Sequence, residues 1–127
     1  MTDAPLDAWD KVVAFALTLP GTVAAKSWGG PAVAIAANGR AFIYPGRERD
    51  TSFALAIDRD TIELLKDTEP ETYWQSPHYE GWPAVLVRFD SPDPERVRQM
   101  IDRAREQATA MKPVRKRKSQ AGSKGGT

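Results

Sequence analysis

Short apolar segments with two different periods follow one another along this chain, and prolines and glycines separate them. From Pro5 to Leu19 the apolar residues recur at helical spacing, and Pro20-Gly21 ends the pattern. Segments 26–28, 32–36, 40–44 and 53–57 are typical of short strands, with Asn38-Gly39 as a hairpin turn. The chain has 127 residues, so one domain with a single core is expected.

The second half contains the same two kinds of segment. Asp58 or Asp60 is placed to cap a second, short helix. Residues 84–89 form the clearest strand pattern, and Pro94 then starts a last helix that runs to about residue 108. This order predicts an α+β fold, a two-layer sandwich in which helices cover one face of an antiparallel sheet. The other face of such a sheet is often open to solvent, which makes it a candidate binding surface.

Charge divides the chain into two parts. Residues 111–127 carry six basic side chains and no acidic one, a net charge of +6. Residues 1–110 hold the other 12 basic side chains and all 17 acidic ones, which gives −5. Because residues 111–127 offer almost nothing apolar to bury, they are expected to stay disordered. The sequence therefore predicts a folded domain over 1–110 and a disordered basic tail over 111–127.

The chain contains no cysteine, which excludes disulfides, a thiolate nucleophile, iron–sulfur clusters and cysteine-ligated zinc. His78 is the one histidine, so most metal sites lack a second imidazole, and no Gly-x-Ser-x-Gly elbow occurs. His78 with Glu80 or Tyr79 is the remaining catalytic candidate. We expect no catalytic constellation, no metal site and no cofactor, and the protein is predicted not to be an enzyme.

No stretch approaches the roughly 20 apolar residues of a membrane helix, and residues 1–5 lack the cationic-then-apolar order of a signal peptide. A cytoplasmic protein without a membrane partner is therefore expected. Its predicted state is a monomer or a weak dimer.

Residues 73–83 are unusual because they bring four aromatic residues, the histidine, two prolines and a glycine together. His78, Tyr79 and Trp82 would present stacking and hydrogen-bonding surface to a ligand; the alternative is that these rings pack across a sheet edge. Trp28 precedes two glycines, a pattern that favours a turn.

Basic residues also occur along the predicted sheet. They are Lys26, Arg40, Arg47, Arg49 and Arg88. They would form a stripe that contacts phosphates, or they would pair locally with the acidic side chains of the domain.

Three motifs in a fixed order carry a resemblance to a known family. They are Leu19-Pro20-Gly21-Thr22, Ser27-Trp28-Gly29-Gly30-Pro31-Ala32, and Ser76-Pro77-His78-Tyr79-Glu80-Gly81-Trp82-Pro83 ahead of Val85-Leu86-Val87-Arg88. Over about residues 8–110 the chain resembles the MmcQ/YjbR family of small bacterial proteins. Tyrosine is usual in the family where Trp82 stands, and a charged residue is common where Gly30 stands.

The resemblance implies one helix, three strands, a helix, two strands and a final helix. It also implies the description attached to the family, a "double wing" DNA-binding protein in which strand pairs act as wings; no catalytic activity is carried over. On this hypothesis the five basic residues contact DNA phosphates, and Trp28, His78, Tyr79 or Trp82 stack. The alternative is a non-catalytic protein- or small-ligand-binding domain, since the fold type is shared with chaperone-like proteins and the folded part is acidic.

Overall fold

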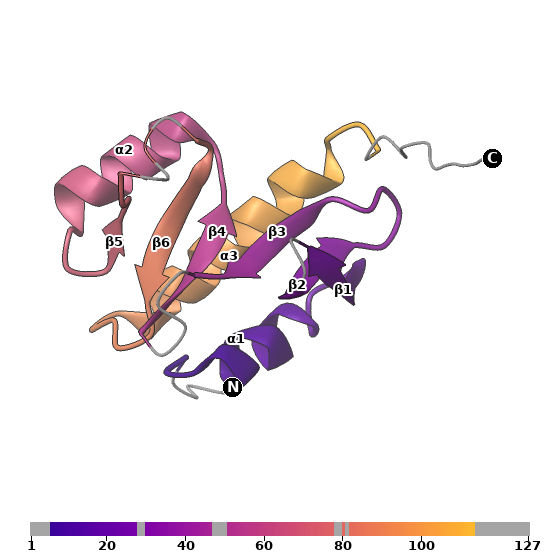
Figure 1. Ribbon diagram of the computed structural model, residues 1–127, viewed down its shortest axis with the longest axis horizontal. Coiled ribbons are helices and arrows are strands. Elements are labelled where there is room, and N and C mark those ends of the chain that lie inside the picture. The colour runs from indigo at the N-terminus through magenta and orange to yellow at the C-terminus, as the bar shows by residue number, and fades with distance from the viewer. Residues whose placement is uncertain (1–5, 28–29, 47–50, 78–79, 81, 114–127) are drawn as a thin grey trace.

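The computed structural model describes residues 6–27, 30–46, 51–77, 80 and 82–113. Within them the helices are α1 (Trp9–Ala16), α2 (Arg59–Thr68) and α3 (Pro94–Thr109). The strands are β1 (Thr22–Ser27), β2 (Gly30–Ile35), β3 (Ala41–Pro45), β4 (Ser52–Ala56), β5 (Tyr73–Trp74) and β6 (Ala84–Arg88). Figure 1 shows α3 running behind the central strands, while α2 lies beside β5.

The described strands form one six-stranded sheet in the order β1-β2-β3-β4-β6-β5, and every pairing is antiparallel. Four strands lie between α1 and α2, one more than the resemblance implied. The additional strand is a complete edge strand, because β1 pairs residue for residue with β2 from Thr22↔Ile35 to Ser27↔Gly30. The predicted strand at 26–28 therefore begins earlier, at Thr22.

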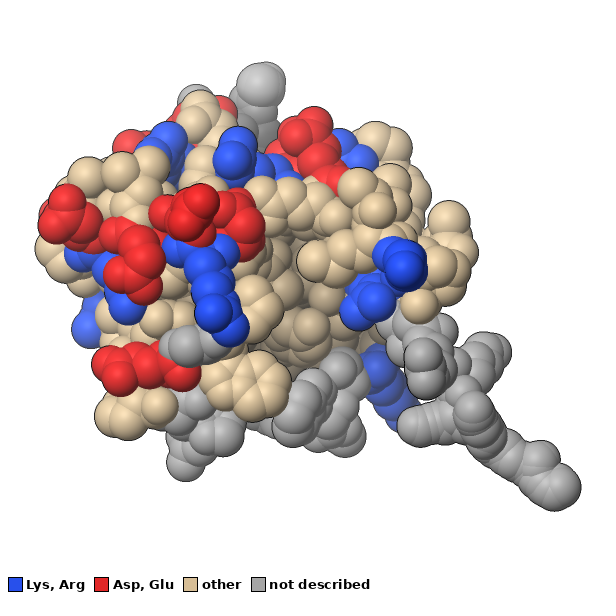
Figure 2. Space-filling view, turned by 90° about the horizontal axis from the view of Figure 1, so that it is seen from above, with Lys and Arg blue, Asp and Glu red and all other residues tan. Residues whose placement is uncertain are grey.

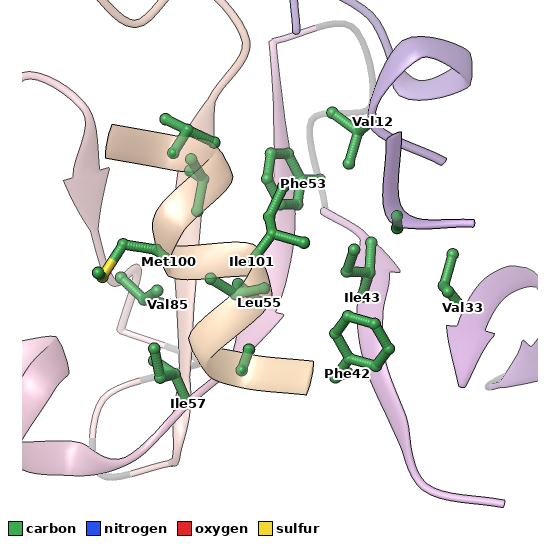
Figure 3. Close-up of a cluster of buried hydrophobic side chains, with 14 of the residues drawn as sticks. Val12, Val33, Phe42, Ile43, Phe53, Leu55, Ile57, Val85, Met100 and Ile101 are labelled. Carbon is green, nitrogen blue, oxygen red and sulfur yellow. The ribbon is translucent and has the colours of Figure 1, made fainter. Parts of the chain in front are cut away.

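A single hydrophobic core fills the space between the sheet and the helices. All three helices contribute buried side chains to it, as do β2, β3, β4 and β6. Figure 3 shows Val12 of α1 and Ile101 of α3 near Phe53 and Leu55 of β4. Since the helices share this one cluster, they cover one face of the sheet. The predicted α+β fold with an antiparallel sheet is confirmed.

One irregularity in β3 changes which residues reach the core. The β2–β3 register shifts between Val33, which pairs with Ile43, and Ala34, which pairs with Ala41. The extra residue, Phe42, forms a β-bulge, and both Phe42 and Ile43 are fully buried in the core. Strict alternation would have placed them on opposite faces of the sheet.

Asp58, rather than Asp60, caps α2. Its carboxylate accepts a hydrogen bond from the backbone N–H of Thr61 at 2.9 Å. The side chain of Gln107 binds it reciprocally: the Gln107 amide donates to the Asp58 carboxylate and accepts from the Asp58 backbone N–H at 3.0 Å. The start of α2 is thereby fixed to the last turns of α3.

The β2–β3 hairpin holds the C-terminal end of α3. The side-chain amide of Asn38 donates to the carbonyl oxygens of Ala108 at 2.8 Å and Met111 at 3.1 Å. Arg40 Nε donates to the carbonyl oxygen of Lys112 at 2.7 Å. Gly39 has a φ of 74°, which a glycine in this turn adopts without strain. Contacts with the domain thus continue past residue 110, where the sequence suggested its boundary, while 114–127 lie outside the described residues.

Tyr73 of β5 carries a buried hydroxyl group that has no hydrogen-bond partner among the described residues. Burial raises the pKa of this phenol well above its usual value, and the nearby charge of Glu69 adds to the increase, so the group stays neutral. An unpaired buried hydroxyl already carries its desolvation cost in the folded protein.

Tyr73→Phe is therefore expected to leave the free energy of unfolding unchanged or to raise it by up to about 1 kcal/mol, as measured by urea denaturation. Tyr44→Phe is the matched control, because the Tyr44 hydroxyl donates to the carbonyl oxygen of Ala41 at 3.0 Å. That change is expected to cost about 1 kcal/mol. If Tyr73→Phe lowered the free energy of unfolding by more than about 1 kcal/mol, the Tyr73 hydroxyl would be shown to be paired in solution, for example with an ordered water.

Candidate functional site

The face of the sheet that points away from the helices is called the outer face here. In β4, Phe53 and Leu55 point into the core, so Ala54 lies on the outer face. Strand pairing then places Tyr44, Ala54, Leu86 and Trp74 in one row across β3, β4, β6 and β5. The large aromatic side chains of Tyr44 and Trp74 thus lie at the two ends of the row, and the smaller Ala54 and Leu86 lie between them.

Arg88 lies next to this row and covers the ring of Trp74. It is two residues from Leu86 on β6, and Leu86 pairs with Trp74, so Arg88 and Trp74 are diagonal neighbours on the outer face. The guanidinium carbon is 4.5 Å from the centre of the Trp74 ring. This is the geometry of a cation–π contact. Arg88 is exposed, whereas Trp74 is partly buried.

The strands carry no acidic residue. None of the described strand residues is Asp or Glu, and two of them, Lys26 and Arg88, are basic. The described acidic residues lie on the helices, at their caps and in connections. In Figure 2 acidic and basic side chains are interspersed on the left, the side on which α2 lies in Figure 1. The described acidic side chains, which give the folded part its net negative charge, therefore lie outside the strands.

The structure does not gather the described members of the predicted basic stripe. Lys26 pairs with Pro31 and shares its face with Val33, so it lies on the helix side of the edge strand β1. Arg40 lies in the β2–β3 hairpin and is bonded to the Lys112 carbonyl. Of the strand residues described, Arg88 is the one cation on the outer face. The remaining predicted contacts, Trp28, Arg47, Arg49, His78 and Tyr79, lie outside the described residues.

Gln75 fixes the backbone on either side of Pro83, just ahead of β6 and within it. Its side-chain amide donates to the carbonyl oxygens of Trp82 at 3.1 Å and Ala84 at 2.8 Å, and its oxygen accepts from Lys66 Nζ at 2.9 Å. Trp82, a predicted stacking residue, is 57% exposed. Gln75 thus fixes the backbone of Trp82, while much of the Trp82 side chain stays open to solvent.

Trp74 is the residue of this site that sequence reasoning missed. It belongs to the aromatic segment that the sequence singled out, but it was not among the expected contacts. The signal that would have found it is the pairing of Trp74 with Leu86, which sets Arg88 over the ring. That pairing is a property of the sheet register.

The described part of the chain lacks both a metal cluster and a membrane-spanning helix. It contains no group of three or more His, Cys, Asp or Glu residues placed to hold a metal ion. None of its helices has the length and apolar character needed to cross a membrane.

Comparison with known proteins gives a family. Residues 17–107, well over half of the chain, match the model of the YjbR family. This chain belongs to the YjbR family. The YjbR match includes every described strand, and therefore the whole outer face, but leaves out α1. No curated protein matches the chain, and no solved structure matches it.

Proposed function

We propose that this YjbR protein is a non-catalytic nucleic-acid-binding protein, with DNA as its ligand, and that it binds through the outer face of its sheet. The observation that carries the proposal is the exposed Arg88 stacked on Trp74, on a sheet whose described strands contain no acidic residue. Cations and aromatic rings on an accessible surface are the two groups that bind phosphates and bases.

The acidic balance of residues 1–110 argues against polyanion binding only if the charge lies on the binding surface. Here the acidic side chains lie on helices, caps and connections, and the sheet separates most of them from the outer face. The basic tail supplies a second, sequence-independent attraction to phosphates. A test therefore has to separate the contribution of the tail from that of the sheet.

The separation is made in a full-length background, called the tail-neutralised protein, in which all six basic residues of 111–127 are changed to Gln. In that background, Arg88→Gln is expected to weaken DNA binding about 5- to 10-fold at low salt, because it removes both the cation and the stacking group. Fluorescence anisotropy of labelled oligonucleotides over a salt series measures the effect.

Arg103→Gln is the matched control. Arg103 is also exposed, with 53% of its side chain accessible, but it lies on α3 on the other side of the sheet. Its change is expected to alter affinity by less than about two-fold. Equal losses in the two variants would show that only overall charge matters. Absence of binding in the tail-neutralised protein would favour the alternative, a protein- or small-ligand-binding domain.

A further inference from the structure

We infer that the Arg88–Trp74 pair is a stacking site for unpaired bases, so that the protein prefers single-stranded nucleic acid to duplex. This inference rests on the proposed function and names its ligand class. The guanidinium lies over the indole at 4.5 Å, and Arg88 is exposed to solvent. An unpaired base is a flat group that continues such a stack, base on guanidinium on indole.

The exposed part of the site is Arg88 itself. Ala54 and Leu86, the residues between Trp74 and Tyr44 in the row, are 0% and 3% exposed, so other atoms of the domain cover the middle of the row. Trp74 is partly buried, with the guanidinium of Arg88 over its ring. A base would therefore stack on the guanidinium of Arg88 and not on the strands.

The distribution of charge favours stacking over phosphate contacts as the main source of affinity at this face. Duplex binding depends on several cations that track the two backbones. The outer-face positions of the described strands provide one cation, Arg88, because Lys26 lies on the opposite face. Bases in a duplex are already stacked on each other, so their faces are not available to the pair.

Arg88→Lys separates stacking from charge. Lysine keeps the positive charge but lacks the planar group that stacks on the indole and on a base. In the full-length, tail-neutralised protein, a labelled 12-nucleotide oligo(dT) is expected to bind about 10-fold more tightly than a 12-base-pair duplex. Arg88→Lys is expected to weaken oligo(dT) binding at least about 5-fold. The logarithm of the affinity is expected to fall with the logarithm of salt concentration with a slope of about −1 or shallower.

Substitutions of Trp74 provide a second test of the stacking site. Trp74→Leu removes the ring below the guanidinium and is expected to weaken oligo(dT) binding by a similar factor, while Trp74→Phe keeps a ring and retains most of the affinity. Thermal unfolding followed by circular dichroism verifies that each variant is folded.

The outcomes separate this inference from the proposed function. Duplex binding that equals or exceeds oligo(dT) binding, or an Arg88→Lys variant with unchanged affinity, overturns the stacking site while nucleic-acid binding stands. If neither ligand binds the tail-neutralised protein, the proposed function itself fails and the stacking site fails with it. A preference for oligo(dT) that Arg88→Lys and Trp74→Leu both reduce, and Trp74→Phe largely restores, supports the inference.

Discussion

Replacing Phe53 with alanine is expected to lower the free energy of unfolding by about 3–5 kcal/mol. Phe53 is fully buried in β4, at the centre of the sheet, and its ring stacks on Phe89 with centroids 5.8 Å apart. Truncation removes these contacts and leaves a cavity that β3 and β6, which flank Phe53 through Pro45 and Val87, cannot close without moving. Such a loss is a large fraction of the stability of a small domain.

Urea denaturation followed by circular dichroism measures this loss. Leu64→Ala is the matched control, since Leu64 is a large apolar residue that is 53% exposed on α2. Its change is expected to alter stability by no more than about 0.5 kcal/mol. Comparable losses in the two variants would contradict the position of the core between the sheet and the helices.

Asp58→Ala is expected to lower the free energy of unfolding by about 2 kcal/mol. The change removes the N-cap of α2 and also leaves the side-chain amide of Gln107 without its acceptor. Asp58→Asn keeps a capping side chain and is expected to cost less. Equal losses from Ala and Asn would show that the negative charge, not the cap, is what matters.

The same residue makes stability depend on pH. Burial raises the pKa of Asp58, but hydrogen bonds from Thr61 and Gln107, with the nearby Arg103, outweigh burial, so the pKa lies below the ordinary 3.8. A depressed pKa in the folded state adds stability above the unfolded pKa, and this stability is lost as pH falls through the folded value. The gap in stability between the wild type and Asp58→Asn should therefore be constant near neutral pH and shrink below about pH 4.

Much of the fold could be predicted because it depends on local patterns. The alternation of Phe53 and Leu55, the turn at Asn38-Gly39 and the periodic apolar face of the last helix each specify their element within a few residues. The expected helix over 5–19 has a shorter regular part, Trp9–Ala16. The residue pattern alone did not predict the two-residue strand β5, because so short a strand has no period of its own and exists only through its pairing with β6. The family resemblance did imply a second strand between the second and last helices.

The candidate site was less predictable, since it depends on register. Lys26 and Arg88 look alike in the sequence, but the pairings of β1 and β6 place them on opposite faces. The bulge at Phe42 likewise shifts the face assignment within β3. Alanines such as Ala54 add to the ambiguity, because alanine is compatible with either face. Trp74 gains its role only when the sheet sets it beside Arg88.

The hydrogen bonds from Asn38 and Arg40 fix the start of the basic tail at the C-terminal end of α3. Arg40 holds the carbonyl oxygen of Lys112, the second residue of the tail, at 2.7 Å. From this anchor to Trp74 a ligand must cross three strand spacings and about four residues along β3, roughly 20 Å in all. The start of the tail and the Arg88–Trp74 pair are therefore two ends of one path across the domain. A ligand shorter than that path would meet one end or the other, and only a longer one would be held at both.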